Sequence, residues 1–182
     1  MWLGNGFHAG NAYFSTPHAK EYAEGVYNPE TGLVKFRNVC WFTNIDHGRR
    51  HQPLPLMTLE DNLRFSKHKE IKGKGYDKYD NYNAIEVPFT DAIPSDYDGI
   101  MGVPISFLDK YNPEQFEIVG MCENEDLYNQ KTKVYTTEEC KQAYLAKFGK
   151  KGTYDMNASG VVFRDGLFEK VYQRVLIRHK KG

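Results

Sequence analysis

The spacing of hydrophobic and polar positions changes several times along the chain, and each change predicts an element. β-Branched and aromatic residues fill positions 33–45, LVKFRNVCWFTNI, as they do in a strand. The turn-rich NPETG at 28–32 comes just before, so EGVY at 24–27 and LVKF at 33–36 are expected to form a hairpin. Two further short strands are predicted, NAIEV at 83–87 and FEIV at 116–119.

The strongest helical pattern covers residues 137–148. Thr136 and Glu139 have the spacing of a capping box, in which each side chain bonds the backbone N–H of the other residue. Gly149 follows the last apolar position and suits the left-handed conformation that ends many helices. We therefore expect one regular helix here.

A second hairpin is predicted near the end of the chain. GVVF at 160–163 and LFEKVYQRVLI at 167–177 both have the composition of strands. Asp165-Gly166 lies between them and is a strong signal for a tight turn.

Two segments have no regular pattern. Residues 99–112, GIMGVPISFLDKYN, are interrupted by glycine and proline and allow only a helical turn or two after Pro104. Residues 67–82, KHKEIKGKGYDKYDNY, show no periodicity and are expected to form a polar, mobile loop. The whole pattern, which contains no internal repeat, predicts a mixed α/β protein.

Composition narrows the class of protein. At 182 residues, with 40% hydrophobic and 26% charged residues, the chain suits one soluble globular domain. No apolar run in it comes near the roughly 20 residues of a membrane span, and we expect no signal peptide. Cys40, Cys122 and Cys140 are far apart and form no CxxC pair, which favours a reducing compartment over a zinc site. We expect a cytoplasmic protein with no membrane partner.

The formal net charge is +0, but the charges are segregated. Residues 49–78 carry eight bases against four acids, residues 79–128 eleven acids against one base, and residues 131–182 twelve bases against five acids. Two interpretations stay open. The blocks are solvated faces, as such runs often are, or the two basic segments converge on a polyanion while the acidic middle faces away.

Two short motifs give little support for a cofactor or metal site. GNGFHAG at 4–10 looks like a nucleotide-binding loop, but only residues 1–3 precede it, so we expect a glycine-rich turn. Asp46, His47 and His51 could be metal ligands, but the HGRRH pattern lacks the glutamate of a zinc protease.

Four stretches carry a family resemblance: VCWFTNIDH at 39–47, KYDNYNAIEV at 78–87, DYDGIMGVPISFLDKYNPEQFEIVG at 96–120 and YQRVLIRHKK at 172–181. Together they resemble the C-terminal half of EcoRI-type adenine-specific DNA methyltransferases from restriction–modification systems. The resemblance covers most of the chain and is weakest at residues 123–160.

This resemblance implies an α/β fold, in which a mixed sheet forms the C-terminal part of a Rossmann-like methyltransferase domain with target-recognition loops. Residues 1–182 would form a single partial domain. Its sheet strands would occupy residues 1–48, a basic loop residues 49–82, and recognition and C-terminal elements residues 83–182.

Enzymes that methylate amino groups need two motifs that this sequence lacks. One is a glycine-containing loop after a strand, which holds S-adenosylmethionine; the other is an (Asn/Asp/Ser)-Pro-Pro-aromatic tetrapeptide, which binds the target amino group and stacks on the flipped base. The chain has eight prolines but no Pro-Pro pair, and Asn112-Pro113 is followed by Glu114. In the family both motifs lie upstream of the region seen here. We therefore expect a truncated chain that binds no S-adenosylmethionine and transfers no methyl group alone.

The resemblance also assigns candidate DNA contacts. A strand after the catalytic loop often supplies an aromatic to the extruded base in these enzymes, which makes Trp41 or Phe42 a candidate, with Asn44 and Asp46 at the pocket rim. Trp41 and Phe42 should face opposite ways, so one is expected in the core, and the alternative that both are buried packing stays open. The basic residues expected to meet phosphates are Arg49, Arg50, Lys67, Lys69, Lys72 and Lys74.

The sequence thus predicts the DNA-recognition portion of an adenine-N6 methyltransferase, with double-stranded DNA and the remaining methyltransferase segment as partners. A non-enzymatic DNA-binding or interaction protein from a truncated phage or plasmid gene is the alternative. A metal-dependent hydrolase that uses His47 and His51 is a third possibility, which metal uptake would reveal.

Overall fold

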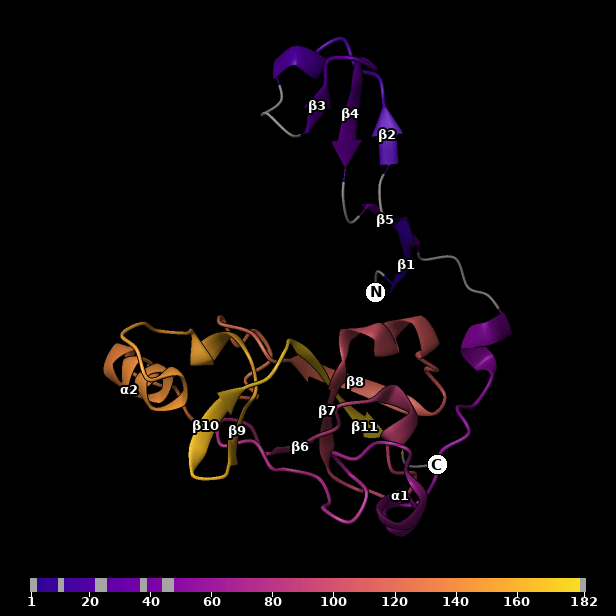
Figure 1. Ribbon diagram of the computed structural model, residues 1–182. Helices are drawn as coiled ribbons and strands as arrows, with labels where there is room; N and C mark the ends of the chain where they lie inside the picture. Colours follow the sequence, from indigo (N-terminus) through magenta and orange to yellow (C-terminus); the bar gives the residue numbers. More distant parts are fainter. Residues whose placement is uncertain (1–2, 10–11, 22–25, 37–38, 44–47, 181–182) are drawn as a thin grey trace. The chain divides into compact units, whose positions relative to one another are not determined.

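The computed structural model describes residues 3–9, 12–21, 26–36, 39–43 and 48–180 (Figure 1). The chain divides into two compact units, Met1–Asp46 and His47–Gly182. The expectation of a single partial methyltransferase domain, with segments at residues 1–48, 49–82 and 83–182, stays a prediction.

The smaller unit is built from short antiparallel strands. β1 (Leu3–Ala9) pairs with β5 (Val39–Thr43), and a separate sheet has the order β2 (Ala12–Phe14), β4 (Leu33–Phe36), β3 (Tyr27–Asn28). A 3-10 helix, η1 (Ala19–Glu21), lies between β2 and β3 in the sequence. Val34 on the central strand lies opposite both Phe14 and Tyr27 and is fully buried.

The predicted hairpin around NPETG is confirmed, because β3 and β4 pair with Tyr27 opposite Val34. A single strand over residues 33–45 is wrong, since β4 and β5 belong to different sheets. The expected glycine-rich turn near the N-terminus is also wrong. Residues 3–9 are extended there, because their backbone pairs with β5 from Leu3 opposite Thr43 to Ala9 opposite Val39.

The larger unit contains a four-stranded mixed sheet. Its order is β6 (Ala84–Glu86), β7 (Ile100–Pro104), β11 (Arg174–His179), β8 (Phe116–Met121). β6 runs parallel to β7, whereas β11 is antiparallel to both β7 and β8. This mixed sheet agrees with the predicted α/β class, and the Rossmann-like relationship stays a prediction.

A helix and a hairpin form a second layer of structure beside this sheet (Figure 1). They are α2 (Thr137–Phe148), β9 (Val161–Arg164) and β10 (Leu167–Lys170). The predicted helix is confirmed in detail, since the capping box of Thr136 and Glu139 is present and Gly149 is left-handed with φ 65°. The Asp165-Gly166 turn is confirmed as well, with φ 51° and 81°.

The remaining helices are short. They are α1 (Leu59–Phe65), η2 (Gly48–His51), η3 (Thr90–Ala92), η4 (Ile105–Lys110) and η5 (Met156–Ala158). The helical turn expected after Pro104 is η4, but α1 was not predicted, although Thr58 caps it by accepting a hydrogen bond from the Asp61 backbone N–H at 3.1 Å. No helix in the described part of the chain is long and apolar enough to cross a membrane.

Two predictions near the sheet need correction. The strand expected over residues 167–177 is broken, because β10 ends at Lys170 and pairs with β9, while β11 begins at Arg174 and pairs with β7 and β8. The glycines and proline in residues 99–112 concealed strand β7, which is paired on both sides.

Buried aromatic and aliphatic side chains hold the larger unit together. Phe107 on η4 packs edge-on against Phe116 on β8, with ring centroids 5.2 Å apart, and both are fully buried. Ile177 on β11 is also fully buried. A smaller cluster joins α2 to the hairpin through Cys140, Ala143, Met156, Val161 and Tyr135. Burial of such side chains is worth about 1.5–3 kcal/mol each, so these contacts fix the sheet and the helix.

Candidate nucleic-acid interface

The segment after α1 carries the predicted lysines on a braced turn. Ile71 is 1% exposed and anchors it. The backbone N–H groups of Gly73 and Gly75 donate to the carbonyls of Leu63 and Ile71 at 2.9 and 3.0 Å. Both glycines have positive φ, 73° and 100°, which this path requires. Residues 67–75 therefore form an ordered turn in the structure rather than the polar, mobile loop that the sequence suggested.

The second half of that segment differs from the prediction in another way. Tyr79 and Tyr82 are buried in the core, and Asn81 is fully buried. The Asn81 side chain donates to the Ser159 carbonyl and accepts from the Val161 N–H, both at 2.9 Å. Residues 79–82 thus fasten this segment to β9, and only its first half is a polar surface.

The four predicted lysines do not have the same surroundings. Lys67 is bound to an acid, since its Nζ lies 2.6 Å from Asp91. The His68 ring also bonds Asp91 at 2.8 Å and stacks on Phe89 with centroids 3.6 Å apart. Hydrogen bonds from Lys67 and His68 hold the pKa of Asp91 below its ordinary value although partial burial raises it. Lys67 is therefore the lysine least available to a phosphate.

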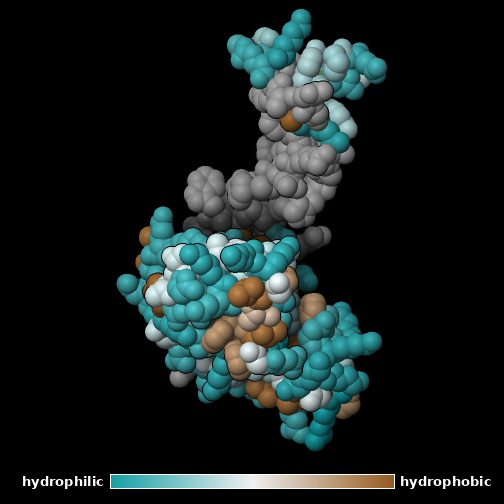
Figure 2. All heavy atoms as spheres, turned by 60° about the vertical axis from the view of Figure 1, so that its left-hand side comes forward, coloured by the Kyte–Doolittle hydropathy of each residue, from teal (hydrophilic) through white to brown (hydrophobic). Residues whose placement is uncertain are grey.

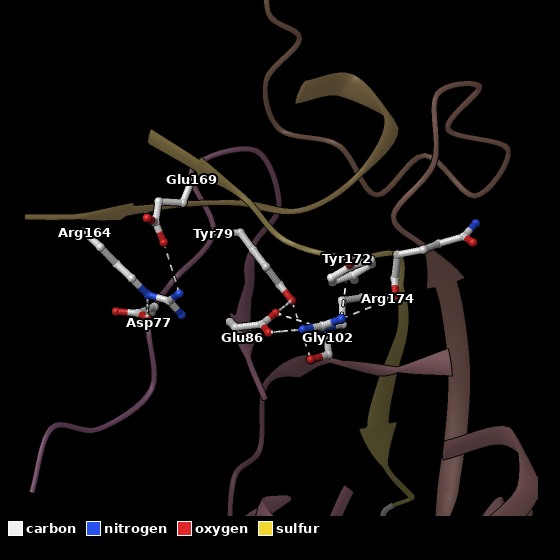
Figure 3. Close-up of polar contacts among 9 residues, drawn as sticks. Asp77, Tyr79, Glu86, Gly102, Arg164, Glu169, Tyr172 and Arg174 are labelled. Carbon is white, nitrogen blue, oxygen red and sulfur yellow. Dashed lines mark hydrogen bonds and ion pairs between the residues drawn. The ribbon is translucent and has the colours of Figure 1, made fainter. Parts of the chain in front are cut away.

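Lys69, Lys72 and Lys74 are exposed, and none has an acidic partner within the part of the chain that the structure describes. Lys74 also borders a hollow of about 480 Å³ that includes Tyr76, Asp77 and Arg164. Arg164 cannot contribute a free charge there, because its guanidinium lies 2.6 Å from Asp77 and 3.4 Å from Glu169 (Figure 3). Burial lowers the pKa of Arg164, but these two acids raise it by more.

The other predicted site residues lie wholly or partly outside the described residues. Asn44 and Asp46 are not among them, and neither is His47 of the candidate metal site. Trp41 and Phe42 lie in β5, opposite Asn5 and Gly4, but their side chains are not described.

The side chains of Arg49 and Arg50 in η2 are not described either. Within the same helix, the His51 ring bonds Glu114 at 3.0 Å. No group of three or more potential metal ligands occurs within the described ranges.

A buried polar network was not identified from the sequence. Glu86 on β6 is 2% exposed and accepts three hydrogen bonds from the Arg174 guanidinium on β11, at 2.6, 3.1 and 3.1 Å (Figure 3). The Tyr79 hydroxyl donates to the same carboxylate, and burial together with Glu86 raises the pKa of Tyr79 well above its ordinary value. The sequence did contain a signal for this network, because AIEV and RVLI each place one charged residue in an otherwise apolar strand.

The role of this network is structural: it holds strands and their connections in place. Arg174 also donates to the Tyr172 and Gln173 carbonyls at 3.3 and 3.5 Å, so it fixes the link between β10 and β11. The Tyr79 ring lies over Gly102 on β7, where any Cβ would collide with it. Three strands of the mixed sheet are therefore tied together by one buried ion pair and one tyrosine.

The junctions that follow the parallel strands of the mixed sheet do not fit S-adenosylmethionine. The parallel strands β6 and β7 are followed by Val87-Pro88 and by η4, and neither junction contains the glycine that a loop holding this cofactor needs. Glu86, the carboxylate at the end of β6, is already occupied by Arg174. We therefore derive no chemical step through this cofactor from these residues.

Comparison with known proteins agrees with the resemblance seen in the sequence. The family model described as "Adenine-specific methyltransferase EcoRI" matches residues 1–180. The type II methyltransferase M.EcoRI of Escherichia coli is 40% identical over 122 residues, which cover 65% of this chain and 35% of that protein. M.MgeORF184P of Mycoplasma genitalium is 40% identical over 109 residues, which cover 54% of this chain and 31% of that protein. No solved structure matches the chain.

The chain thus spans about a third of the length of these curated relatives. Because the family model covers nearly the whole sequence, the matched region includes the lysine turn, the mixed sheet and the α2–hairpin layer. The chain belongs to the EcoRI family of adenine-specific methyltransferases.

Proposed function

We propose that this chain supplies DNA contacts for an adenine-N6 methyltransferase of the restriction–modification type, with the catalytic and cofactor-binding residues in other sequence. The observation that carries the proposal is the braced turn with Lys69, Lys72 and Lys74, which are exposed and lack acidic partners within the described residues. In a family whose name specifies adenine methylation, DNA is the polyanion that such a turn would meet.

The geometry of the turn suits phosphate contacts. Its backbone is held by hydrogen bonds and by buried Ile71, so the lysines project from a fixed base. Lysine binds phosphate as a point charge at the end of a flexible stem and needs no exact orientation. Contacts of this kind set the position of a protein on a duplex without reading its sequence.

The absence of methyl transfer by the chain alone is part of the proposal. The sequence contains no Pro-Pro pair, and the nearest match begins at Asn112. Asn112 is 1% exposed, and its Oδ1 accepts from the Glu114 backbone N–H at 2.8 Å. This side chain therefore supports a local turn and is not presented to a base.

DNA binding can be tested by fluorescence anisotropy with a labelled duplex over a range of salt concentrations. Replacement of Lys69, Lys72 and Lys74 by Ala should weaken binding and reduce the slope of log K against log[salt] by about 2.7, since each phosphate contact contributes about 0.9. The matched control replaces Lys20, Lys110 and Lys141, also exposed, and removes the same charge. An equal change of slope in both triple variants would show that only net charge matters and would refute the assignment of the turn.

Methyl transfer is tested separately with labelled S-adenosylmethionine and adenine-containing duplex DNA. The 182-residue chain should leave the DNA unlabelled. Clear incorporation of label would contradict the proposal that catalysis depends on other sequence.

A further inference from the structure

A pocket of about 690 Å³ lies between the second half of α2 and the link from β10 to β11. Residues from α2, from the segment at 154–159 and from the link at 170–173 line it. Figure 2 looks toward this side of the larger unit, where apolar residues gather among hydrophilic ones. The proposed phosphate contacts do not use this pocket, because none of the three lysines of the turn lines it.

Aromatic rings form much of the pocket wall. Tyr144 packs against Phe148 and Tyr154, with ring centroids 4.6 and 5.6 Å apart. The Tyr154 hydroxyl donates to the Phe168 carbonyl at 2.7 Å, which fixes that ring. Phe148 is 50% exposed and Tyr172 87% exposed, so two aromatic faces are accessible to a ligand.

The exposed ring of Tyr172 stands on a fixed backbone. Arg174 donates to the Tyr172 carbonyl while its guanidinium is held by buried Glu86 (Figure 3). A large ring on a held backbone loses little conformational freedom when it binds, since only its own side-chain torsions must be ordered.

The polar groups of the pocket favour an anionic ligand. Its lining includes two lysines and no carboxylate. Lys147 is paired with Glu169 at 2.7 Å, whereas Lys170 has no acidic partner within the described ranges. Ser159 also lines the pocket and is 1% exposed, and its hydroxyl has no hydrogen-bond partner among the residues described. Such a buried hydroxyl costs free energy unless a ligand supplies its partner.

We infer that this pocket binds a single unstacked nucleotide of the DNA. The base stacks on Tyr172 and Phe148, Ser159 supplies a hydrogen bond to the base, and Lys170 faces the phosphate. Every base has a π-face, so stacking of this kind tolerates any sequence. The inference rests on the proposed DNA-binding function. It adds a second DNA contact to the phosphate contacts of the lysine turn, and this second contact requires a base that has left the base stack of the duplex.

The chemistry of the lining distinguishes this ligand from others. A purely apolar partner would leave Ser159 unpaired, and an inorganic anion would not need the aromatic walls. A nucleotide uses the rings, the hydroxyl and the free ammonium group together. Its size also suits the pocket, which falls within the range of about 300–1,000 Å³ that is usual for ligand sites.

The test compares two DNA probes by fluorescence anisotropy with the 182-residue chain: a perfect duplex, and the same duplex with one unpaired adenine. The unpaired base has already left the stack, so the wild-type chain should bind the second probe more tightly. Tyr172→Ala should reduce this preference by about 5- to 150-fold, the value of one base–aromatic stack. Tyr128→Ala is the matched control, since Tyr128 is 54% exposed and does not line the pocket.

Ser159→Ala supplies a second test that does not depend on an exposed ring. It removes a hydroxyl that has no partner in the described residues, so the melting temperature should not fall, while the preference for the unpaired adenine should decrease several-fold. A residue that serves only in packing would not be expected to keep the melting temperature unchanged while its replacement removes the preference for the unpaired adenine.

The possible failures are distinguishable. Equal binding of both probes, with the lysine turn still controlling the salt dependence, would overturn this inference and leave the proposed function standing. No DNA binding at all would overturn both. Self-association that Tyr172→Ala abolishes, without a preference for the unpaired adenine, would assign the pocket to protein contact instead and overturn the nucleotide assignment.

Discussion

Arg174→Met is the substitution that most directly tests how the larger unit is held together. It leaves the Glu86 carboxylate, which is 2% exposed, without the three hydrogen bonds of the guanidinium and with only the Tyr79 hydroxyl. Removal of one partner from a buried pair costs about 3–5 kcal/mol, because the remaining charge is uncompensated. For a unit of this size that corresponds to a fall in melting temperature of about 10–18 °C.

Arg178→Met is a close control for this experiment. Arg178 lies on the same strand and pairs with Glu117 at 2.7 Å, but the side chains are 51% and 46% exposed. Exposed pairs of this kind add little to stability, so its melting temperature should stay close to that of the wild type. Calorimetry or urea titration followed by circular dichroism measures both variants.

A double variant separates the loss of the pair from the isolation of a charge. Glu86→Leu combined with Arg174→Met replaces the ion pair by apolar side chains, a change that is often nearly neutral. It should therefore be more stable than Arg174→Met alone. Equal stability of Arg174→Met and Arg178→Met would refute the reasoning, since burial would then make no difference.

Four further predictions concern other parts of the chain. Gly102→Ala should destabilise the protein by about 1–3 kcal/mol in urea titration, because its Cβ would collide with the Tyr79 ring. Thr136→Ala should cost about 1 kcal/mol by the same measurement, through loss of the capping box. Burial raises the pKa of Asp80, but hydrogen bonds from Lys133 and Tyr135 lower it by more, so the net pKa lies below the ordinary value of 3.8. The stability from this carboxylate should therefore be lost as the pH falls below that value, and Asp80→Asn should flatten the pH dependence there. In a full-length enzyme, one of Trp41 and Phe42 should face the core, and its Ala variant should be less stable by about 3–5 kcal/mol. The Ala variant of the other residue should keep normal stability and have lower methylation activity.

Local signals in the sequence predicted the elements whose causes are local. Thr136, Glu139 and Gly149 specify the ends of α2 through their own side chains and backbone, and Asp165-Gly166 adopts the positive φ angles that its hairpin turn requires. None of these features depends on a distant partner. They could therefore be inferred from spacing alone.

Elements that depend on distant partners were missed. Gly102 looked like an interruption of a strand, but it lies within β7. A side chain at this position would collide with the ring of Tyr79, a residue 23 positions earlier in the sequence. The break between β10 and β11 depends in the same way on Glu86, which holds Arg174 across the sheet. Of the candidate DNA contacts, the lysines of the turn were identifiable by composition, but the binding of Lys67 to Asp91 was not, since these residues meet only in the fold.

The spatial order of the mixed sheet has a consequence for biosynthesis. β11 lies between β7 and β8, yet the whole segment from Cys122 to Gln173 must be translated after β8 before β11 exists. At about 5–20 residues per second this takes about 3–10 seconds. Throughout that interval, β7 and β8 each have an unpaired edge that can join another chain. The mixed sheet can therefore close only after β11 has been synthesised, and a translational pause just before Arg174 would lengthen the exposure of both strand edges.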